Sequence, residues 1–143
     1  MTIYCLRTRG DGTTTIVPIS LHESQSDPFR VNLPTGAGAT LVTGRRERQG
    51  AWHTTPKLGI TVILEGFLDI EVNRAAPERT TLKAGDVLIV LDQTGDGHRS
   101  RAHGPRGMTA LLLPLDAADL PALARHFRDW PAEVTLAPAP APN

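Results

Sequence analysis

Between Ala39 and Leu115, short β-prone runs alternate with turn residues. Most of the runs are rich in Val, Ile, Leu or Thr, each is bounded by Gly, Pro, Asn or Asp, and they span 39–43, 59–64, 67–72, 80–82, 87–91, 98–103 and 108–113. Short strands at such close spacing, separated by turn signals, are typical of a sandwich or small barrel. The pattern predicts an all-β domain over residues 39–115.

Two glycines mark turns within this domain. Gly66 lies between the runs 59–64 and 67–72, and Gly85 lies just ahead of the strongly apolar run 87–91. Because glycine has no Cβ, it adopts positive φ without strain, as tight turns require. We expect a hairpin at Gly66 and a second turn at Gly85.

Residues 1–38 follow a different pattern. Their apolar content is thin, and it is interrupted by Pro18, Pro28 and Pro34. Since proline cannot donate to a ladder, it is excluded from central strands. The segment therefore predicts an N-terminal arm with one or two edge strands, serving packing or dimer contacts.

Beyond the predicted domain the chain becomes helical and then repetitive. Within residues 116–130 four apolar side chains recur at helical spacing, which predicts a short amphipathic helix: Leu120, Leu123, Ala124 and Phe127. Residues 131–143 end in an alternation of Ala and Pro that has nothing to bury, and they predict a disordered tail.

Composition narrows the classes of partner. The 143 residues carry 15 Lys+Arg and 15 Asp+Glu, with no basic block, which argues against a nucleic-acid partner. The single cysteine, Cys5, excludes an intramolecular disulfide and a cysteine-based zinc site. No apolar run approaches the roughly 18 residues that span a bilayer, and the N-terminus lacks the apolar stretch of a signal peptide. These features predict a soluble, cytoplasmic, single-domain protein with no membrane partner.

Four motifs occur in order between Trp52 and Arg99. Trp52-His53 is followed by the hairpin at Gly66, by Ala84-Gly85-Asp86-Val87 and by Thr94-Gly95-Asp96-Gly97-His98. This order resembles that of the cupins, and in particular of small single-domain bacterial cupins, over residues 39–115. The resemblance implies a double-stranded β-helix, also called a jelly-roll barrel, and a twofold homodimer.

The metal-binding motifs of that family are only partly present. His53 and His98 match two of its three metal-binding histidines, whereas Thr55 stands in place of the third and Gly59 in place of the glutamate. Catalytic zinc usually takes three protein ligands. The resemblance therefore implies a degenerate site without a metal. The alternative is one divalent ion (Fe, Mn, Zn or Ni) on His53 and His98. The candidates to complete such a site are Glu23, Asp92, His22 and His103, and their spacing does not select one of them.

Alternation along strands groups the polar candidates. Side chains two positions apart share a face, so Thr55 points the same way as His53, and Ser100 the same way as His98. Thr61 belongs to a similar set on the run 59–64. If these faces point inward, as the resemblance implies, the lumen holds two imidazoles and a few hydroxyls among aliphatic walls.

This chemistry suits proton transfer on a small molecule. Imidazole gains and loses a proton near neutral pH, so we expect His53 and His98 to act as general acid and base. The predicted function is an isomerase, cyclase or lyase that acts on a small apolar or carbonyl-containing substrate, with secondary metabolism as a candidate setting. Candidate substrate-binding residues are Thr55, Thr61, Ser100 and Asp92. Asp92 is also a candidate to orient an imidazole, or to serve only as a turn residue.

Two alternatives remain open. One is a divalent-metal-dependent cupin oxygenase or lyase. The other is a non-catalytic module that binds a small ligand, or whose interior is simply filled by side chains, since a barrel of about eight strands leaves little room. A lumen plugged by Ile63, Leu91 and Leu111 would support the filled interior.

Overall fold

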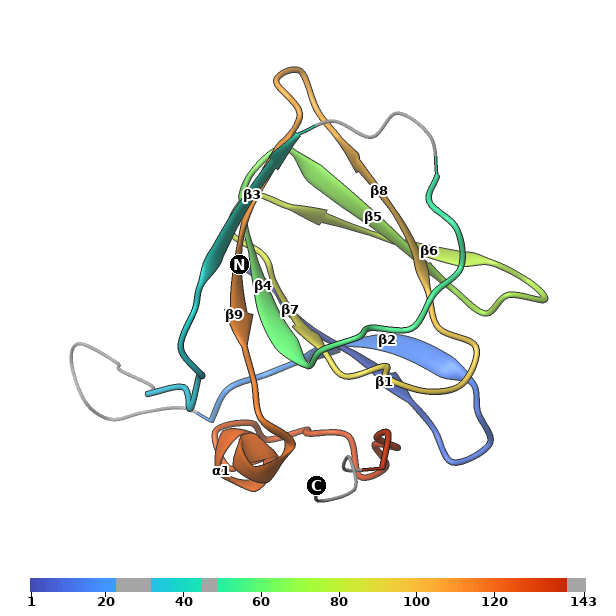
Figure 1. Ribbon diagram of the computed structural model, residues 1–143, viewed down its shortest axis with the longest axis vertical. Coiled ribbons are helices and arrows are strands. Elements are labelled where there is room, and N and C mark those ends of the chain that lie inside the picture. The colour runs from blue at the N-terminus through green and yellow to red at the C-terminus, as the bar shows by residue number, and fades with distance from the viewer. Residues whose placement is uncertain (23–31, 45–48, 139–143) are drawn as a thin grey trace, which may run out of the picture.

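A computed structural model describes residues 1–22, 32–44 and 49–138 of the chain. Within these residues it is mostly β-structure, with nine strands and one short helix (Figure 1). The strands are β1 (Ile3–Thr8), β2 (Thr14–Ile19), β3 (Thr40–Gly44), β4 (Gly59–Glu65), β5 (Phe67–Val72), β6 (Glu78–Lys83), β7 (Val87–Val90), β8 (Arg99–His103) and β9 (Met108–Pro114). The predicted all-β class is confirmed.

The strands form two sheets that face each other (Figure 1). The larger sheet has the order β2-β1-β7-β4-β9-β3, and the smaller has the order β6-β5-β8. Neighbouring strands are antiparallel except β1 and β7, which are parallel. The described strands do not close into one barrel. The two sheets therefore show the all-β class, and the jelly-roll barrel stays a prediction.

The N-terminal segment contributes a central strand, which the sequence pattern did not predict. β1 lies between β2 and β7, and Cys5 and Leu6 on it are fully buried, on opposite faces of the sheet. Pro18 lies on β2 at the edge, where its missing amide proton costs no ladder bond. The expected arm thus holds one edge strand and one inner strand. Pro28 falls outside the described residues.

The larger sheet is buried on both faces because its apolar side chains alternate. One set, Leu6, Ile63, Leu88, Met108 and Ala110, points toward the smaller sheet and forms an inner core with Ile70, Val72 and Leu82 of that sheet. The other set points to the opposite face and forms an outer core with the C-terminal segment: Cys5, Leu58, Ile60, Ile89, Leu91, Leu115, Leu120, Leu123 and Phe127. Two apolar layers therefore share one sheet.

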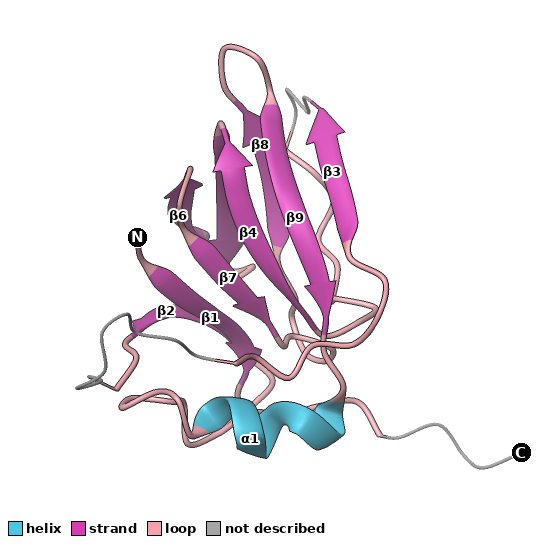
Figure 2. Ribbon diagram, turned by 90° about the vertical axis from the view of Figure 1, so that its left-hand side faces the viewer, coloured by secondary structure: helices cyan, strands magenta, loops and turns pink. Residues whose placement is uncertain are grey.

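The C-terminal helix is shorter than the pattern predicts. A 3-10 turn (Ala117–Asp119) leads into α1 (Leu120–Ala124), which lies near the end of the larger sheet where β4 begins and β9 ends (Figure 2). The helix stops because the backbone beyond it pairs with the end of β2: the amide of Arg128 donates to the carbonyl of Ser20 at 2.9 Å. No helix of the described residues has the length and apolarity to cross a membrane.

Part of the expected tail is packed. Val134 and Leu136 contact the outer core, and the amide of Thr135 donates to the carbonyl of Thr8 at 2.9 Å. The side chain of Glu133 accepts a hydrogen bond from the amide of Gly10. The prediction of a disordered tail from residue 131 is therefore wrong for 133–136, because these residues have apolar surface to bury. Residues 139–143 lie outside the described part of the chain.

The outer core predicts how strongly α1 supports the fold. Leu123 is fully buried beneath the larger sheet, so Leu123→Ala leaves a cavity and should lower the free energy of unfolding by about 2–5 kcal/mol. Leu64→Ala is the matched control, because Leu64 is 51% exposed and should cost about 0.5 kcal/mol or less. Urea titration followed by circular dichroism measures both. Equal effects would mean that α1 does not belong to the cooperative core.

Candidate functional site

A cavity of about 450 Å³ opens between the two sheets. Its inner end is apolar and is formed by Ile70, Leu88, Met108 and Ala110, all of which are buried. Val42 and Leu112, both more than a third exposed, lie at its outer end. A volume of this size is typical of small-molecule sites.

The structure brings five of the six predicted site residues to this cavity. Polar side chains from three separate segments line it: His53, Thr55, Thr61, His98 and Ser100. The sixth, Asp92, is not among the lining residues and is fully buried. Asp92 therefore has no access to a substrate, and its predicted substrate-binding role is replaced by a contact with His98.

His53 and His98 are held together by their backbones. The amide of each donates to the carbonyl of the other at 2.8 Å, which makes an isolated antiparallel bridge. Residues paired in this way place their side chains on the same face of the ladder. The imidazole centroids accordingly lie 4.4 Å apart, with the ring planes inclined at 55°. The two rings are thus in contact on one wall of the cavity.

A backbone carbonyl determines the tautomer of His53. Its Nδ1 lies 3.0 Å from the carbonyl oxygen of Ala51. Because a carbonyl only accepts, Nδ1 carries the proton, and Nε2 of the neutral ring keeps its lone pair. His53 is exposed, so this lone pair belongs to a ring that a ligand can reach.

A buried carboxylate holds the ring of His98. Nδ1 of His98 donates to Oδ2 of Asp92 at 2.5 Å, and His98 is only 7% exposed. Burial raises the pKa of Asp92, and the hydrogen bond and charge of His98 oppose that rise. Oδ1 of Asp92 has no hydrogen-bond partner. The Asp92 carboxyl thus holds the ring of His98 through Oδ2 and orients it.

Hydrogen bonds attach the loop before His98 to the hairpin of β1 and β2. Thr8 and Thr14, which face each other across β1 and β2, are almost completely buried. The amide of Gly97 donates to Oγ1 of Thr14 at 3.0 Å, and Oγ1 of Thr8 donates to the carbonyl of Thr94 at 2.6 Å. Both ends of the loop are held by side chains from the N-terminal strands.

Lys57 brings positive charge to the cavity. It is exposed and lines the same cavity as His53 and Thr55, four and two positions before it. The hydroxyl of Thr55 donates to the carbonyl of Lys57 at 2.7 Å. The proton of this hydroxyl is therefore used in a hydrogen bond within the same segment. Thr61 and Ser100 remain as the lining hydroxyl groups on β4 and β8.

The donor set fits a metal poorly. Within the described ranges, no group of three or more His, Cys, Asp and Glu side chains is placed to hold an ion. Two imidazoles are fewer than the three protein ligands of a catalytic zinc or of the facial triad of iron oxygenases. Of the residues suggested to complete a site, Asp92 is engaged with His98, and neither His22 nor His103 lines the cavity. Glu23 falls outside the described residues.

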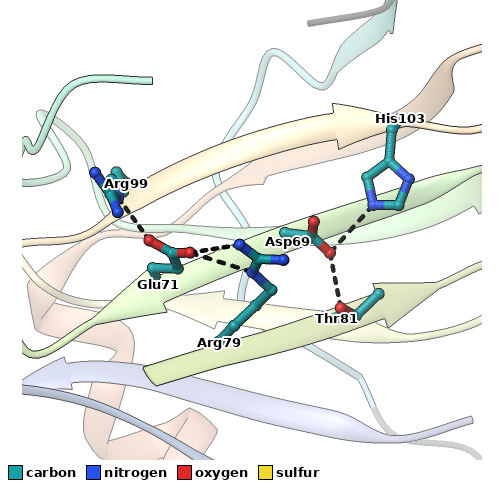
Figure 3. Close-up of polar contacts among 6 residues, drawn as sticks. All are labelled: Asp69, Glu71, Arg79, Thr81, Arg99 and His103. Carbon is teal, nitrogen blue, oxygen red and sulfur yellow. Dashed lines mark hydrogen bonds and ion pairs between the residues drawn. The ribbon is translucent and has the colours of Figure 1, made fainter. Parts of the chain in front are cut away.

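His103 belongs to a second polar cluster, on the smaller sheet (Figure 3). Its Nε2 lies 3.1 Å from Oδ1 of Asp69, which also accepts from the hydroxyl of Thr81 at 2.7 Å. Burial raises the pKa of Asp69, but the hydrogen bonds from Thr81 and His103 outweigh it and the pKa is lowered.

Glu71, two positions along β5, joins the same cluster (Figure 3). It accepts hydrogen bonds from Arg79 and Arg99, which lower its pKa. None of the six residues drawn in Figure 3 lines the cavity. The ring of Trp52 lies 5.1 Å from the Arg99 guanidinium and joins this cluster.

The interior is partly filled. Ile63 is fully buried in the inner core, as a filled interior would require. Leu91, however, packs in the outer core beneath the C-terminal segment, and Leu111 is not in contact with the cavity. The side chains expected to plug the lumen therefore lie largely elsewhere, and room for a ligand remains.

The sequence pattern did not single out three residues of the site. Lys57 follows Pro56 in a bend, and Thr8 and Thr14 lie on strands that the pattern described as an arm. The alternation of His53, Thr55 and Lys57 could have suggested the lysine. Nothing local links the threonines to His98, because their contacts join segments that are distant in the chain.

Gly97 gives a test of the bridge. Its φ is 70°, and a Cβ there would lie inside van der Waals contact of the His53 carbonyl, whereas Gly85 has φ 91° and open space around it. Gly85→Ala should cost about 1–2 kcal/mol, the penalty for positive φ alone. Gly97→Ala should cost about 1–3 kcal/mol more, because the His53 strand must move. Urea unfolding measures both, and similar losses would show that the bridge is not tightly packed.

A scan against models of known protein families and a search of curated proteins each found no match to this chain. The function proposed below rests on the geometry of the cavity.

Proposed function

We propose that this protein is a cupin-like isomerase, cyclase or lyase that moves a proton on a small apolar carbonyl compound without a metal. The observation that carries the proposal is the chain of contacts Asp92–His98–His53 on the wall of an apolar cavity. His53 and His98 are the catalytic residues. Asp92 is a positioning residue.

The two imidazoles are suited to complementary roles. Two cationic rings whose centroids are 4.4 Å apart would repel each other, so the proposed step uses one cationic ring and one neutral ring. A carboxylate at Nδ1 stabilises an imidazolium, and only His98 has one. His98 therefore acts as the acid, and neutral His53, with its lone pair at Nε2, acts as the base.

The proposed step is an enolisation. Nε2 of His53 takes the proton from the carbon next to the substrate carbonyl, and the C–H electron pair becomes the new C=C bond. The carbonyl π electrons take a proton from Nε2 of His98. Return of a proton to a different carbon completes an isomerisation, and attack of the enol on a second carbonyl group completes a cyclisation. Each positioned proton transfer typically contributes about 10²- to 10⁴-fold.

The apolar walls support this chemistry. Leu68, Leu88 and Val90 line the cavity and offer no hydrogen bonds, so water there is weakly held. A carbonyl group entering the cavity meets few side-chain donors from the described residues: His53, His98, Lys57 and the hydroxyl groups of Thr40, Thr55, Thr61 and Ser100. Burying an unpaired polar group elsewhere would cost about 1–3 kcal/mol.

Exchange of α-protons tests the proposal before the natural substrate is known. In D₂O the protein should catalyse deuterium incorporation next to the carbonyl of apolar ketones such as 2-octanone, followed by ¹H NMR. His53→Gln and His98→Gln should each lower this rate by about 10²- to 10⁴-fold. His22→Gln is the control, because His22 is exposed and lies outside the cavity.

The same assay separates the alternatives. Dialysis against EDTA should leave the exchange rate unchanged. If EDTA lowers the exchange rate and Fe, Mn, Zn or Ni restores it, the metal-dependent oxygenase or lyase is favoured. A rate no faster than buffer across a panel of apolar ketones would favour the non-catalytic ligand-binding module. The homodimer stays a prediction, and this assay does not test it.

Asp92→Asn tests the positioning role. An amide side chain can donate to Nδ1, so it should shift the His98 proton to Nε2 and remove the stabilisation of the imidazolium. The exchange rate should fall by about 10²-fold or more. Nitrogen-15 NMR of labelled histidine reports the tautomer directly. An unchanged tautomer and rate would show that Asp92 plays only a structural part.

A further inference from the structure

The charges around the cavity are of one sign. Among the lining residues that the structure describes, Lys57 carries the only permanent formal charge, and two further lining residues, His53 and His98, can become cationic. None of these described lining residues is Asp or Glu. Asp92, which accepts the hydrogen bond from His98, is fully buried. From the described part of the chain, a ligand in this cavity therefore meets cationic groups without a competing carboxylate.

The charge lies at the outer end, and the apolar surface extends inward. Lys57, Thr40 and Gly38 all line the cavity and are exposed. Leu88 and Met108, by contrast, are buried at the inner end. The cavity thus has one polar, cationic mouth and one apolar end, with the histidine pair along the wall that Lys57 shares.

We propose that the cavity binds an amphipathic monocarboxylate. Its carboxylate pairs with the Lys57 ammonium at the mouth, and its apolar body extends past His53 and His98 toward Leu88 and Met108. This inference names the substrate class of the proposed function and rests on it, because the site is the same. A medium-chain carboxylate with a carbonyl group along its chain would present that carbonyl to the two imidazoles.

Other ligand classes fit less well. A second carboxylate at the inner end would be buried among aliphatic side chains with no cation beside it, which is strongly unfavourable. A cationic headgroup would meet Lys57 and find no lining carboxylate. A neutral headgroup leaves Lys57 hydrated, so its disadvantage is only the missing ion pair. At a partly exposed position such a pair is worth about 0.2–1 kcal/mol, which corresponds to at most about fivefold in affinity.

Calorimetric titration with three probes of equal chain length tests the inference. Octanoate should bind more tightly than 1-octanol, and octylamine more weakly than both, at low ionic strength. Lys57→Gln should weaken octanoate binding by about two- to fivefold and leave 1-octanol binding unchanged. Lys83→Gln is the matched control, because Lys83 is the only other lysine of the chain and does not line the cavity. Added salt should reduce the preference for octanoate.

The outcomes are distinguishable from those of the proton-exchange assay. Equal affinity for octanoate and 1-octanol, or equal effects of Lys57→Gln and Lys83→Gln, would overturn the carboxylate inference while leaving the proposed function standing. Failure of all three probes to bind would overturn it as well. Octanoate binding that depends on Lys57, in a protein that exchanges no ketone protons, would support the inference and contradict the catalytic proposal.

Discussion

The backbone bridge between His53 and His98 is the interaction on which the candidate site depends. It joins a loop to the start of β8 through two hydrogen bonds of 2.8 Å, and it brings the imidazoles into contact. Gly97 lets the two backbones approach, and Thr14 holds the loop from the other side. Because backbone and buried side chains set this geometry, the rings are positioned before any ligand arrives, as preorganised catalysis requires.

A small domain can keep a hollow interior only if it buries apolar surface elsewhere. The cavity leaves part of the inner face of the larger sheet unfilled, and unfilled volume costs stability. The outer core compensates, since the C-terminal segment covers the other face of the same sheet and contributes Leu120, Leu123 and Phe127. The helix and the packed residues after it thus serve the site indirectly, by stabilising the sheet that forms its wall.

Two histidine–carboxylate pairs show how surroundings decide what the same groups can do. Asp69 accepts from Thr81 as well as contacting His103, and its pKa is lowered. Asp92 has His98 as its side-chain partner and leaves Oδ1 unpaired, and burial raises its pKa. The first pair belongs to an ion-pair cluster on the smaller sheet. The second faces a ligand-sized cavity, and that is why only the second supports a chemical role.

Local pattern was enough for much of the β-structure. Runs bounded by turn residues predicted β3 to β9 to within a few residues, and Gly66 and Gly85 adopt the positive φ that their turns need. Alternation also grouped His53 with Thr55 and His98 with Ser100. These features depend on neighbours in the chain, which the sequence displays directly.

Tertiary structure decided the rest. The inner position of β1, the early end of α1 and the packing of residues 133–136 each depend on pairing with distant segments. So do the burial of Asp92 behind His98 and the bracing of its loop by Thr8 and Thr14. The amino-acid sequence by itself determined the β class and the candidate histidines, because periodicity and residue chemistry are local properties. Which groups meet across the cavity follows from long-range backbone pairing, and only the folded chain contains that information.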